Sequence, residues 1–254
     1  LDSDYASAFN YKIQALFFKL CYWVADSCII VSQSDLKNIF KVSSLKKKLS
    51  YSEHVINTKL FIADVPKEKI FTSIVWMGDE GNVVRKGVDK ALQIFAELKK
   101  IPEFVDYRFV IIGRKGEGEV LVRSIIDKYN LKGSVELKGE VSEEDKINLL
   151  KQSKYYFQLS LYEGFGLAAL EALCANNIII HSGKGGLANP IYKEQLLFDI
   201  DNDFDSELLK LVNKLACFTP ITSYDNLLEY YDIQRRKDDF EAIIVNGKSN
   251  YKLK

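Results

Sequence analysis

The chain has 254 residues, of which 47% are hydrophobic, so it can bury the core of one large domain or slightly more. Its 35 Lys and Arg residues balance its 35 Asp and Glu residues. A nucleic-acid-binding protein usually carries a basic excess, and this balance argues against a nucleic-acid partner. The four cysteines form no Cys-x-x-Cys pair and lie in apolar stretches, which predicts small core residues in a reducing compartment.

Residues 1–68 carry too few elements for a complete α/β domain. An apolar stretch predicts a helix over residues 8–25, and the two charges that interrupt this stretch favour a buried helix over a membrane span. A strand over 27–31, a helix from about Ser32 and a basic stretch at 45–49 follow. We interpret this part as the tail of a second α/β domain plus a linker.

Residues 69–218 alternate between short apolar runs and segments of helical periodicity. Strands separated by single helices are typical of a Rossmann-like parallel sheet with helices on both faces, and such sheets bind ligands at the carboxyl ends of their strands. Residues 219–254 are predicted to form a C-terminal helical segment, with a charged helix or pair of helices over 223–240. In the central part we expect strands at 71–77, 107–112, 135–137, 155–159 and 177–181, and helices at 88–98, 117–129, 142–152 and 165–175.

The most informative motif is Ser-Leu-Tyr-Glu-Gly-Phe-Gly-Leu-Ala-Ala-Leu-Glu-Ala at residues 160–172, between a predicted strand and a predicted helix. Gly164 and Gly166 allow a tight turn and the close approach of a ligand. The helix N-terminus offers unpaired N–H groups and a positive dipole end, which suit a diphosphate. Glu163 and Glu171 can bind hydroxyl groups on either side of it. Either glutamate alone would indicate only a helix cap or a surface residue, but the complete string favours a ligand site.

This string resembles the motif of the retaining GT-B glycosyltransferases of family 4, a group with bacterial polysaccharide and sucrose-synthase-like enzymes. That family carries Glu-Gly-Phe-Gly and a second glutamate after seven intervening residues, as this chain does at Glu163 and Glu171. The resemblance implies that Glu163 holds the donor sugar and that Glu171 holds the ribose. The residues that it places around the diphosphate are Gly164, Phe165, Gly166 and Leu167.

Other segments extend the resemblance over about residues 22–200. Val-Arg-Lys-Gly-Val-Asp at 84–89 is similar to the family's Lys-Gly-Val turn, which implies that Lys86 pairs with the diphosphate. Residues 24–32 are similar to the last strand of the family's acceptor domain, most of which is expected to be missing here. Further nucleotide contacts are expected at Gly78, Arg85, Gly139, Glu140 and Val141.

One position departs from the family's pattern. Family members carry an arginine directly after the glycine that ends the first strand of the donor domain, and that arginine binds the diphosphate. This chain has Asp79 at that place, and a carboxylate there would repel a phosphate. If the domain binds its donor in the usual way, Asp79 must either point elsewhere or pair with a neighbour such as Arg85, which is also the candidate to replace the missing arginine.

The resemblance implies transfer of a sugar, with retention, from a nucleoside-diphosphate sugar to a glycan or lipid-linked acceptor, as in surface polysaccharide synthesis. Glu163 and Lys86 would be the catalytic residues. Neither a metal nor another cofactor is expected, because Lys86 and the helix terminus supply positive potential at the diphosphate. The protein is expected in the cytoplasm, with peripheral contact at the inner membrane face left open.

Two alternatives belong to other classes. A non-catalytic partner subunit of a glycosyltransferase would keep the fold while another chain supplies the acceptor domain, and Asp79 and the short N-terminal part favour it. A dinucleotide-binding oxidoreductase has only the glycines of residues 113–118 in its support. Their spacing is not that of a Gly-x-Gly-x-x-Gly turn, so we reject this second alternative.

Overall fold

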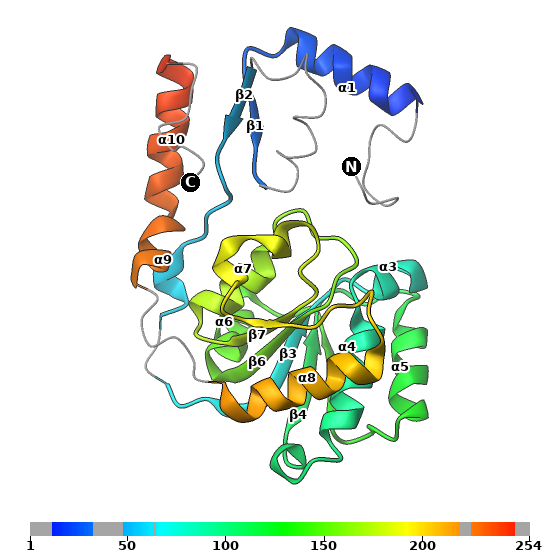
Figure 1. Cartoon of the computed structure of the whole chain (residues 1–254). Helices are drawn as coiled ribbons and strands as arrows, with labels where there is room; N and C mark the ends of the chain where they lie inside the picture. The colour runs from blue at the N-terminus through cyan, green and yellow to red at the C-terminus, as the bar shows by residue number, and fades with distance from the viewer. Residues whose placement is uncertain (1–11, 33–47, 63–64, 219–224, 247–254) are drawn as a thin grey trace.

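The computed structural model describes residues 12–32, 48–62, 65–218 and 225–246, and Figure 1 shows their arrangement. The helix expected from about Ser32 and most of the basic stretch at 45–49 lie outside the described residues.

A parallel sheet of order β5-β4-β3-β6-β7-β8 forms the centre of the described part of the chain. All five strand pairings are parallel. β3 is the first of these strands in the chain and β6 the fourth, so the direction of winding reverses between them. In doubly wound sheets the ligand crevice lies beyond the carboxyl ends of the strands at this reversal. The strands are β3 (Glu68–Ile74), β4 (Arg108–Ile112), β5 (Val135–Gly139), β6 (Ser153–Gln158), β7 (Ile178–His181) and β8 (Leu196–Leu197).

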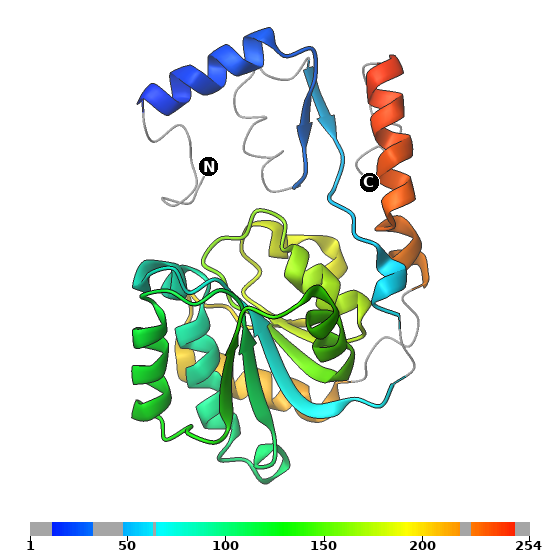
Figure 2. The same ribbon diagram turned by 180° about the vertical axis from the view of Figure 1, so that it is seen from behind.

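Helices cover both faces of this sheet, as the sequence predicted (Figures 1 and 2). Side chains of successive strand residues point to opposite faces, and β6 shows this clearly. Tyr155 and Phe157 stack on Phe71 of β3 in the core under α4, α5 and α8, whereas Tyr156 packs in the core under α6 and α7. These helices are α4 (Val88–Leu98), α5 (Glu119–Lys128), α6 (Glu143–Gln152), α7 (Leu167–Cys174) and α8 (Phe204–Cys217).

Among the α-helices and strands of this domain, three were not predicted from the sequence. They are the short helix α3 (Glu80–Arg85), the edge strand β8 and the helix α8. α8 is nonetheless amphipathic: Leu211 and Leu215 are buried against the sheet, and Asp203 caps its first turn by accepting from Ser206 N at 3.0 Å. The sequence itself carries the apolar spacing of this helix.

The N-terminal part consists of α1 (Lys12–Val24) and a parallel pair of strands, β1 (Cys28–Ile30) and β2 (Leu49–Tyr51). Lys48 ties α1 to β2, because its Nζ donates to the carbonyl oxygens of Trp23 at 2.9 Å and Ala25 at 2.7 Å. The expectation that this helix is buried is wrong for the described chain. Its apolar side chains are 55% to 75% exposed, because two short strands offer too little surface to cover them: Leu16, Phe17, Leu20, Trp23 and Val24.

The prediction that the cysteines are core residues holds only in part. Cys174 is buried in α7, whereas Cys21 in α1 and Cys217 in α8 are exposed. Cys21 shares the exposure of its helix, and Cys217 is the last residue of α8. No described helix has both the length and the hydropathy that a membrane span requires.

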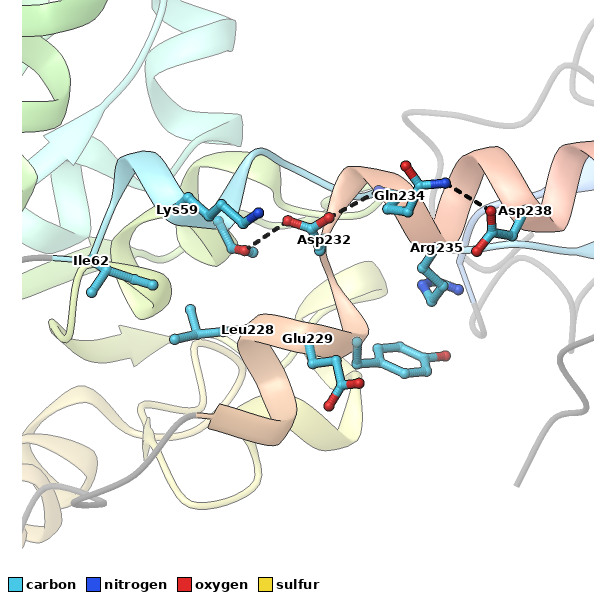
Figure 3. Close-up of a pocket in the computed structure, with 10 residues that line it drawn as sticks. Lys59, Ile62, Leu228, Glu229, Asp232, Gln234, Arg235 and Asp238 are labelled. Carbon is cyan, nitrogen blue, oxygen red and sulfur yellow. Dashed lines mark hydrogen bonds between the residues drawn. The ribbon is translucent and has the colours of Figure 1, made fainter.

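The C-terminal segment forms two helices, α9 (Asp225–Tyr230) and α10 (Ile233–Asn246), and returns to the N-terminal part. Figures 1 and 2 show α10 alongside β2, and Arg236 donates to the carbonyl oxygen of Ser52 at 3.2 Å. A pocket of about 650 Å³ lies where α9 and α10 meet the linker, and Thr58 and Asp232 are among the residues that line it (Figure 3). None of the predicted nucleotide-binding residues lines this pocket.

Candidate functional site

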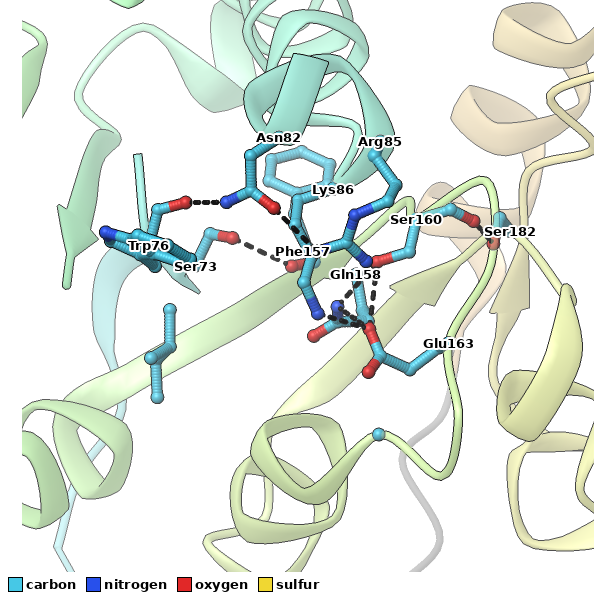
Figure 4. A network of polar contacts seen from close by, with 12 residues as sticks. Ser73, Trp76, Asn82, Arg85, Lys86, Phe157, Gln158, Ser160, Glu163 and Ser182 are labelled. Carbon is cyan, nitrogen blue, oxygen red and sulfur yellow. Dashed lines mark hydrogen bonds and ion pairs between the residues drawn. The ribbon is translucent and has the colours of Figure 1, made fainter. Parts of the chain in front are cut away.

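Two loops meet beyond the carboxyl ends of β3 and β6, at the point where the sheet reverses (Figure 4). The first leads from β3 through α3 to Gly87, and the second carries the motif after β6. Gly87 adopts a left-handed conformation with φ of +69°, and a Cβ there would collide with the carbonyl oxygen of Leu159. Leu161 N donates to the carbonyl oxygen of Arg85 at 2.8 Å. A glycine at position 87 is therefore what lets the two loops dock closely.

This docking brings Lys86 and Glu163 together, although 76 residues separate them in the chain. Lys86 Nζ lies 2.8 Å from Glu163 Oε2, and their side chains are 22% and 15% exposed. Gln158 Nε2 and Ser160 Oγ also donate to Glu163 Oε2, each at 3.1 Å. Within the described residues, Glu163 Oε1 has no hydrogen-bond partner, so this oxygen can accept from a ligand hydroxyl.

The loop after β7 holds the backbone of the motif in place. Gly186 N donates to the carbonyl oxygen of Glu163 at 2.6 Å, and a Cβ on Gly186 would collide with the backbone of Phe165. Phe165 itself is buried, and its ring meets that of His54 in the linker edge-on at a centroid distance of 5.4 Å. The predicted ligand residue Phe165 can therefore contribute its backbone, because its side chain belongs to the core.

α7 begins at Leu167, two residues later than predicted, because Gly166 adopts a left-handed conformation with φ of +89°. In the described structure no side chain caps this helix, and Leu167 is 41% exposed. Gly164 is exposed in the turn before it. The first turn of α7, which begins four residues after Glu163, therefore offers uncapped N–H groups, and such groups suit an anion.

Glu171 lies on α7 but on the side of α6, away from the Lys86–Glu163 pair. Lys146 Nζ in α6 lies 3.0 Å from Glu171, and it also reaches Glu143 at 2.8 Å. Burial raises the pKa of Glu171 against the opposing effect of Lys146. The two glutamates thus lie in different surroundings, and their roles toward a sugar and a ribose stay predictions.

Asp79 caps α3 and does not pair with Arg85. Its Oδ1 accepts from Asn82 N at 2.6 Å. The Asn82 Oδ1 accepts from Arg85 Nη2 at 2.6 Å (Figure 4). Of the two possibilities left by the sequence, the structure selects the one in which Asp79 points elsewhere. The position at which the resemblance leads one to expect an arginine is therefore the N-cap of a short helix here. Asp79 follows directly after the predicted site residue Gly78.

The remaining predicted residues, Gly139, Glu140 and Val141, lie at the end of β5. Gly139 is buried with φ of +79°, and its carbonyl oxygen accepts from Gly113 N at 2.8 Å. Glu140 is exposed and Val141 half-buried. β4 separates this turn from β3, and no contact in the described structure joins the turn to Lys86 or Glu163.

The described residues contain no group of three or more His, Cys, Asp and Glu side chains that could hold a metal ion. Metal-independent binding stays a prediction. Gln158 and Ser160 were not singled out from the sequence, although both touch Glu163. The signal for Gln158 was a polar residue at the end of an apolar strand, which sequence alone cannot distinguish from an edge position.

Residues 81–216 match the protein family described as glycosyl transferases group 1. A GDP-mannose:cellobiosyl-diphosphopolyprenol alpha-mannosyltransferase of Xanthomonas oryzae pv. oryzae is 32% identical over 163 residues, which is 56% of this chain and 40% of that protein. One of the subunits of the phosphatidylinositol N-acetylglucosaminyltransferase of Homo sapiens is 30% identical over 105 residues, 41% of this chain and 21% of that protein. The chain thus spans less than half the length of these two relatives.

Solved structures share the fold. A sucrose-phosphate synthase from Thermosynechococcus elongatus superposes with a TM-score of 0.67 at 21% identity, covering 91% of this chain and 57% of that one. A TarM structure gives a TM-score of 0.69 at 19% identity, covering 96% and 47%. The GT-B resemblance and the Rossmann-like sheet expected from the sequence are confirmed, and the chain belongs to the glycosyl transferases group 1 family.

Proposed function

We propose that this chain is the nucleotide-sugar-binding part of a retaining glycosyltransferase, which transfers a hexose to a glycan or lipid-linked acceptor. The ion pair between Lys86 and Glu163 at the reversal of the sheet carries the proposal. A cation that can bind a diphosphate stands there beside a carboxylate that can bind hydroxyl groups. The uncapped start of α7 adds backbone N–H groups to the same region.

Each group then has one role. Lys86 leaves Glu163 for the diphosphate and, with the N-terminus of α7, stabilises the negative charge that develops on the leaving group. Glu163 accepts from a hydroxyl of the donor sugar, and Glu171 accepts from the ribose. The leaving diphosphate assists delivery of the acceptor hydroxyl, so retention needs no side-chain nucleophile and no metal.

The acceptor is assigned by analogy with the relatives. One is named for a cellobiosyl-diphosphopolyprenol acceptor and another for phosphatidylinositol. Both names contain a lipid, which supports a lipid-linked acceptor for this chain.

Calorimetric titration with UDP, GDP and ADP in EDTA tests the nucleotide site. We expect at least one of them to bind without divalent metal, because Lys86 and α7 supply the positive potential. If none binds at millimolar concentration, the proposal is wrong.

The two glutamates give a sharper prediction. Glu171→Gln should weaken binding of the free nucleotide, whereas Glu163→Gln should weaken only the nucleotide sugar, each by about 1.5–3 kcal/mol for a charged hydrogen bond. Glu143→Gln is the matched control, because Glu143 shares Lys146 with Glu171 but is exposed. Equal effects of the first two substitutions on both ligands would contradict the division of roles.

A partner subunit without catalysis of its own is the second candidate. The exposed apolar face of α1 favours it, because such a face is normally covered by another polypeptide segment. Asp79, which favoured this candidate on the sequence alone, no longer supports it, since it caps α3. Failure of every nucleotide to bind would leave this candidate as the better one.

A further inference from the structure

A line of buried and part-buried hydrogen bonds runs from β3 to the Glu163 carboxylate. Ile74 N, at the end of β3, donates to the Tyr156 hydroxyl at 3.2 Å, and this hydroxyl donates to Gln158 Oε1 at 3.2 Å. Gln158 Nε2 then donates both to Ser160 Oγ at 2.9 Å and to Glu163 Oε2 at 3.1 Å. Every donor along the line points toward the carboxylate.

The line fixes which way the Gln158 amide faces. The Tyr156 hydroxyl accepts from the Ile74 backbone, so its proton is directed at Gln158. A flipped amide would place its carbonyl oxygen against the Glu163 carboxylate and its NH₂ group against the proton of Tyr156. Both contacts would be repulsive, and Gln158 is only 5% exposed, so water cannot relieve them.

From these contacts the geometry points to Gln158 as a positioning residue for the donor sugar. Gln158 and Ser160 both donate to Glu163 Oε2 (Figure 4), which leaves Oε1 for a sugar hydroxyl. This inference rests on the proposed function and adds to it. When a diphosphate draws Lys86 away from Glu163, Gln158 and Ser160 remain to keep the carboxylate in place.

The role separates sugar recognition from nucleotide recognition. Gln158 touches no group assigned to the diphosphate, so its loss should leave the nucleotide contacts of Lys86 and α7 intact. Loss of a residue that only supports the sheet would lower the affinities for the nucleotide sugar and for the free nucleotide together, or would change neither. The ratio of the two affinities is therefore the quantity that identifies a positioning residue.

Gln158→Leu keeps the volume of the side chain and removes its hydrogen bonds. We expect affinity for UDP-glucose or GDP-mannose, whichever binds, to fall about tenfold, since one charge-assisted hydrogen bond loses its geometry. Affinity for the matching free UDP or GDP should stay within about twofold, which is below the effect of one lost hydrogen bond. Tyr156→Phe should act in the same direction and more weakly, because it releases the Gln158 amide but leaves it in place.

Gln195→Leu is the matched control. Gln195 is a second buried glutamine, 6% exposed, directly before the edge strand β8 of the same sheet, and its Oε1 accepts from Ile179 N of β7 at 2.9 Å. This substitution should leave the ratio of the two affinities unchanged. An unchanged ratio in Gln158→Leu, or an equal change in Gln195→Leu, would overturn the inference.

Crystal structures of the wild-type chain and of Gln158→Leu without ligand supply an independent readout. The Glu163 carboxylate should leave its position in the variant while the backbone of the motif stays. A carboxylate that keeps its position refutes the positioning role. If the wild-type chain binds no nucleotide sugar, the proposed function fails, and this comparison still decides the role of Gln158.

Discussion

At the scale of single residues, His181 makes stability depend on pH. Burial at the end of β7 lowers the pKa of this imidazole to about 4, compared with 6.5 for an exposed histidine. Between these values the unfolded chain binds a proton that the folded chain does not, so stability falls as the pH drops from about 6.5 to about 4. The loss attributable to His181 is at most about 3 kcal/mol.

Urea unfolding at pH 7 and pH 4.5 gives the change in the free energy of unfolding between the two pH values. The effect of His181 is the difference in this change between the wild type and His181→Asn. The variant should lose less stability on acidification, because one neutral buried imidazole is gone. His54→Asn is the comparison, since the pKa of His54 is also lowered by burial, but its side chain lies less deeply in the protein. Equal pH dependence in the wild type and in His181→Asn would show that His181 already binds its proton in the folded state.

The sequence predicts candidate site residues where a local motif defines them. Glu163, Gly166 and Glu171 follow from one string in the chain, and the structure places that string between a strand and a helix. The partners of Glu163 and of Glu171 could not be read in this way. Gln158 becomes meaningful only through the Tyr156 hydroxyl, and Lys146 through the packing of α6 on α7, and both depend on tertiary contacts.

At the scale of elements, Asp79 determines the start of α3. Its carboxylate accepts from Asn82 N, one of the backbone donors that a helix leaves unpaired. Asp79→Ala should therefore lower the free energy of unfolding by about 1 kcal/mol, whereas Asp79→Asn should retain most of the cap. Denaturant unfolding compares the two variants.

Asp79→Arg tests the same point from the side of the ligand. Because the side chain at this position faces the first turn of α3, an arginine should not become a phosphate partner, and affinity for UDP or GDP should change less than about twofold. The capping loss should still be visible in unfolding. Binding that tightens several-fold in Asp79→Arg would mean that position 79 faces the diphosphate after all.

Strands and helices with strong periodicity were predictable, and elements that depend on their surroundings were not. α4 and β4 lie where the sequence predicted them, whereas β3 was expected at 71–77 and spans Glu68–Ile74. β8 has two residues and exists because β7 offers it a free edge. α1 was expected to be buried from its composition, but burial also requires a surface to pack against, which the described chain does not supply.

At the scale of the whole molecule, Glu53 joins three parts of the chain that are distant in sequence. Its buried carboxylate accepts from Tyr51 at the end of β2, from Asn189 Nδ2 at 2.8 Å in the loop after β7 and from the Tyr231 hydroxyl at 2.9 Å next to α10. The Glu53 carbonyl oxygen also accepts from Arg235 at 3.3 Å. Because the loop of Asn189 also supports Glu163 through Gly186, the position of the linker is coupled to the site.

Tyr231→Phe isolates the contribution of the C-terminal helices to this junction. The substitution keeps the ring and removes one donor to a buried carboxylate, which should cost about 1.5–3 kcal/mol of local stability. Hydrogen exchange should accelerate in α10 and in residues 50–57, while the amides of β3 and β6 keep their protection, because the sheet has its own core. Tyr129→Phe, in a half-buried tyrosine outside the junction, should change neither region. If exchange in β3 and β6 accelerates as much as in α10, the junction around Glu53 and the domain of the six-stranded sheet unfold as one cooperative unit, which would contradict this prediction.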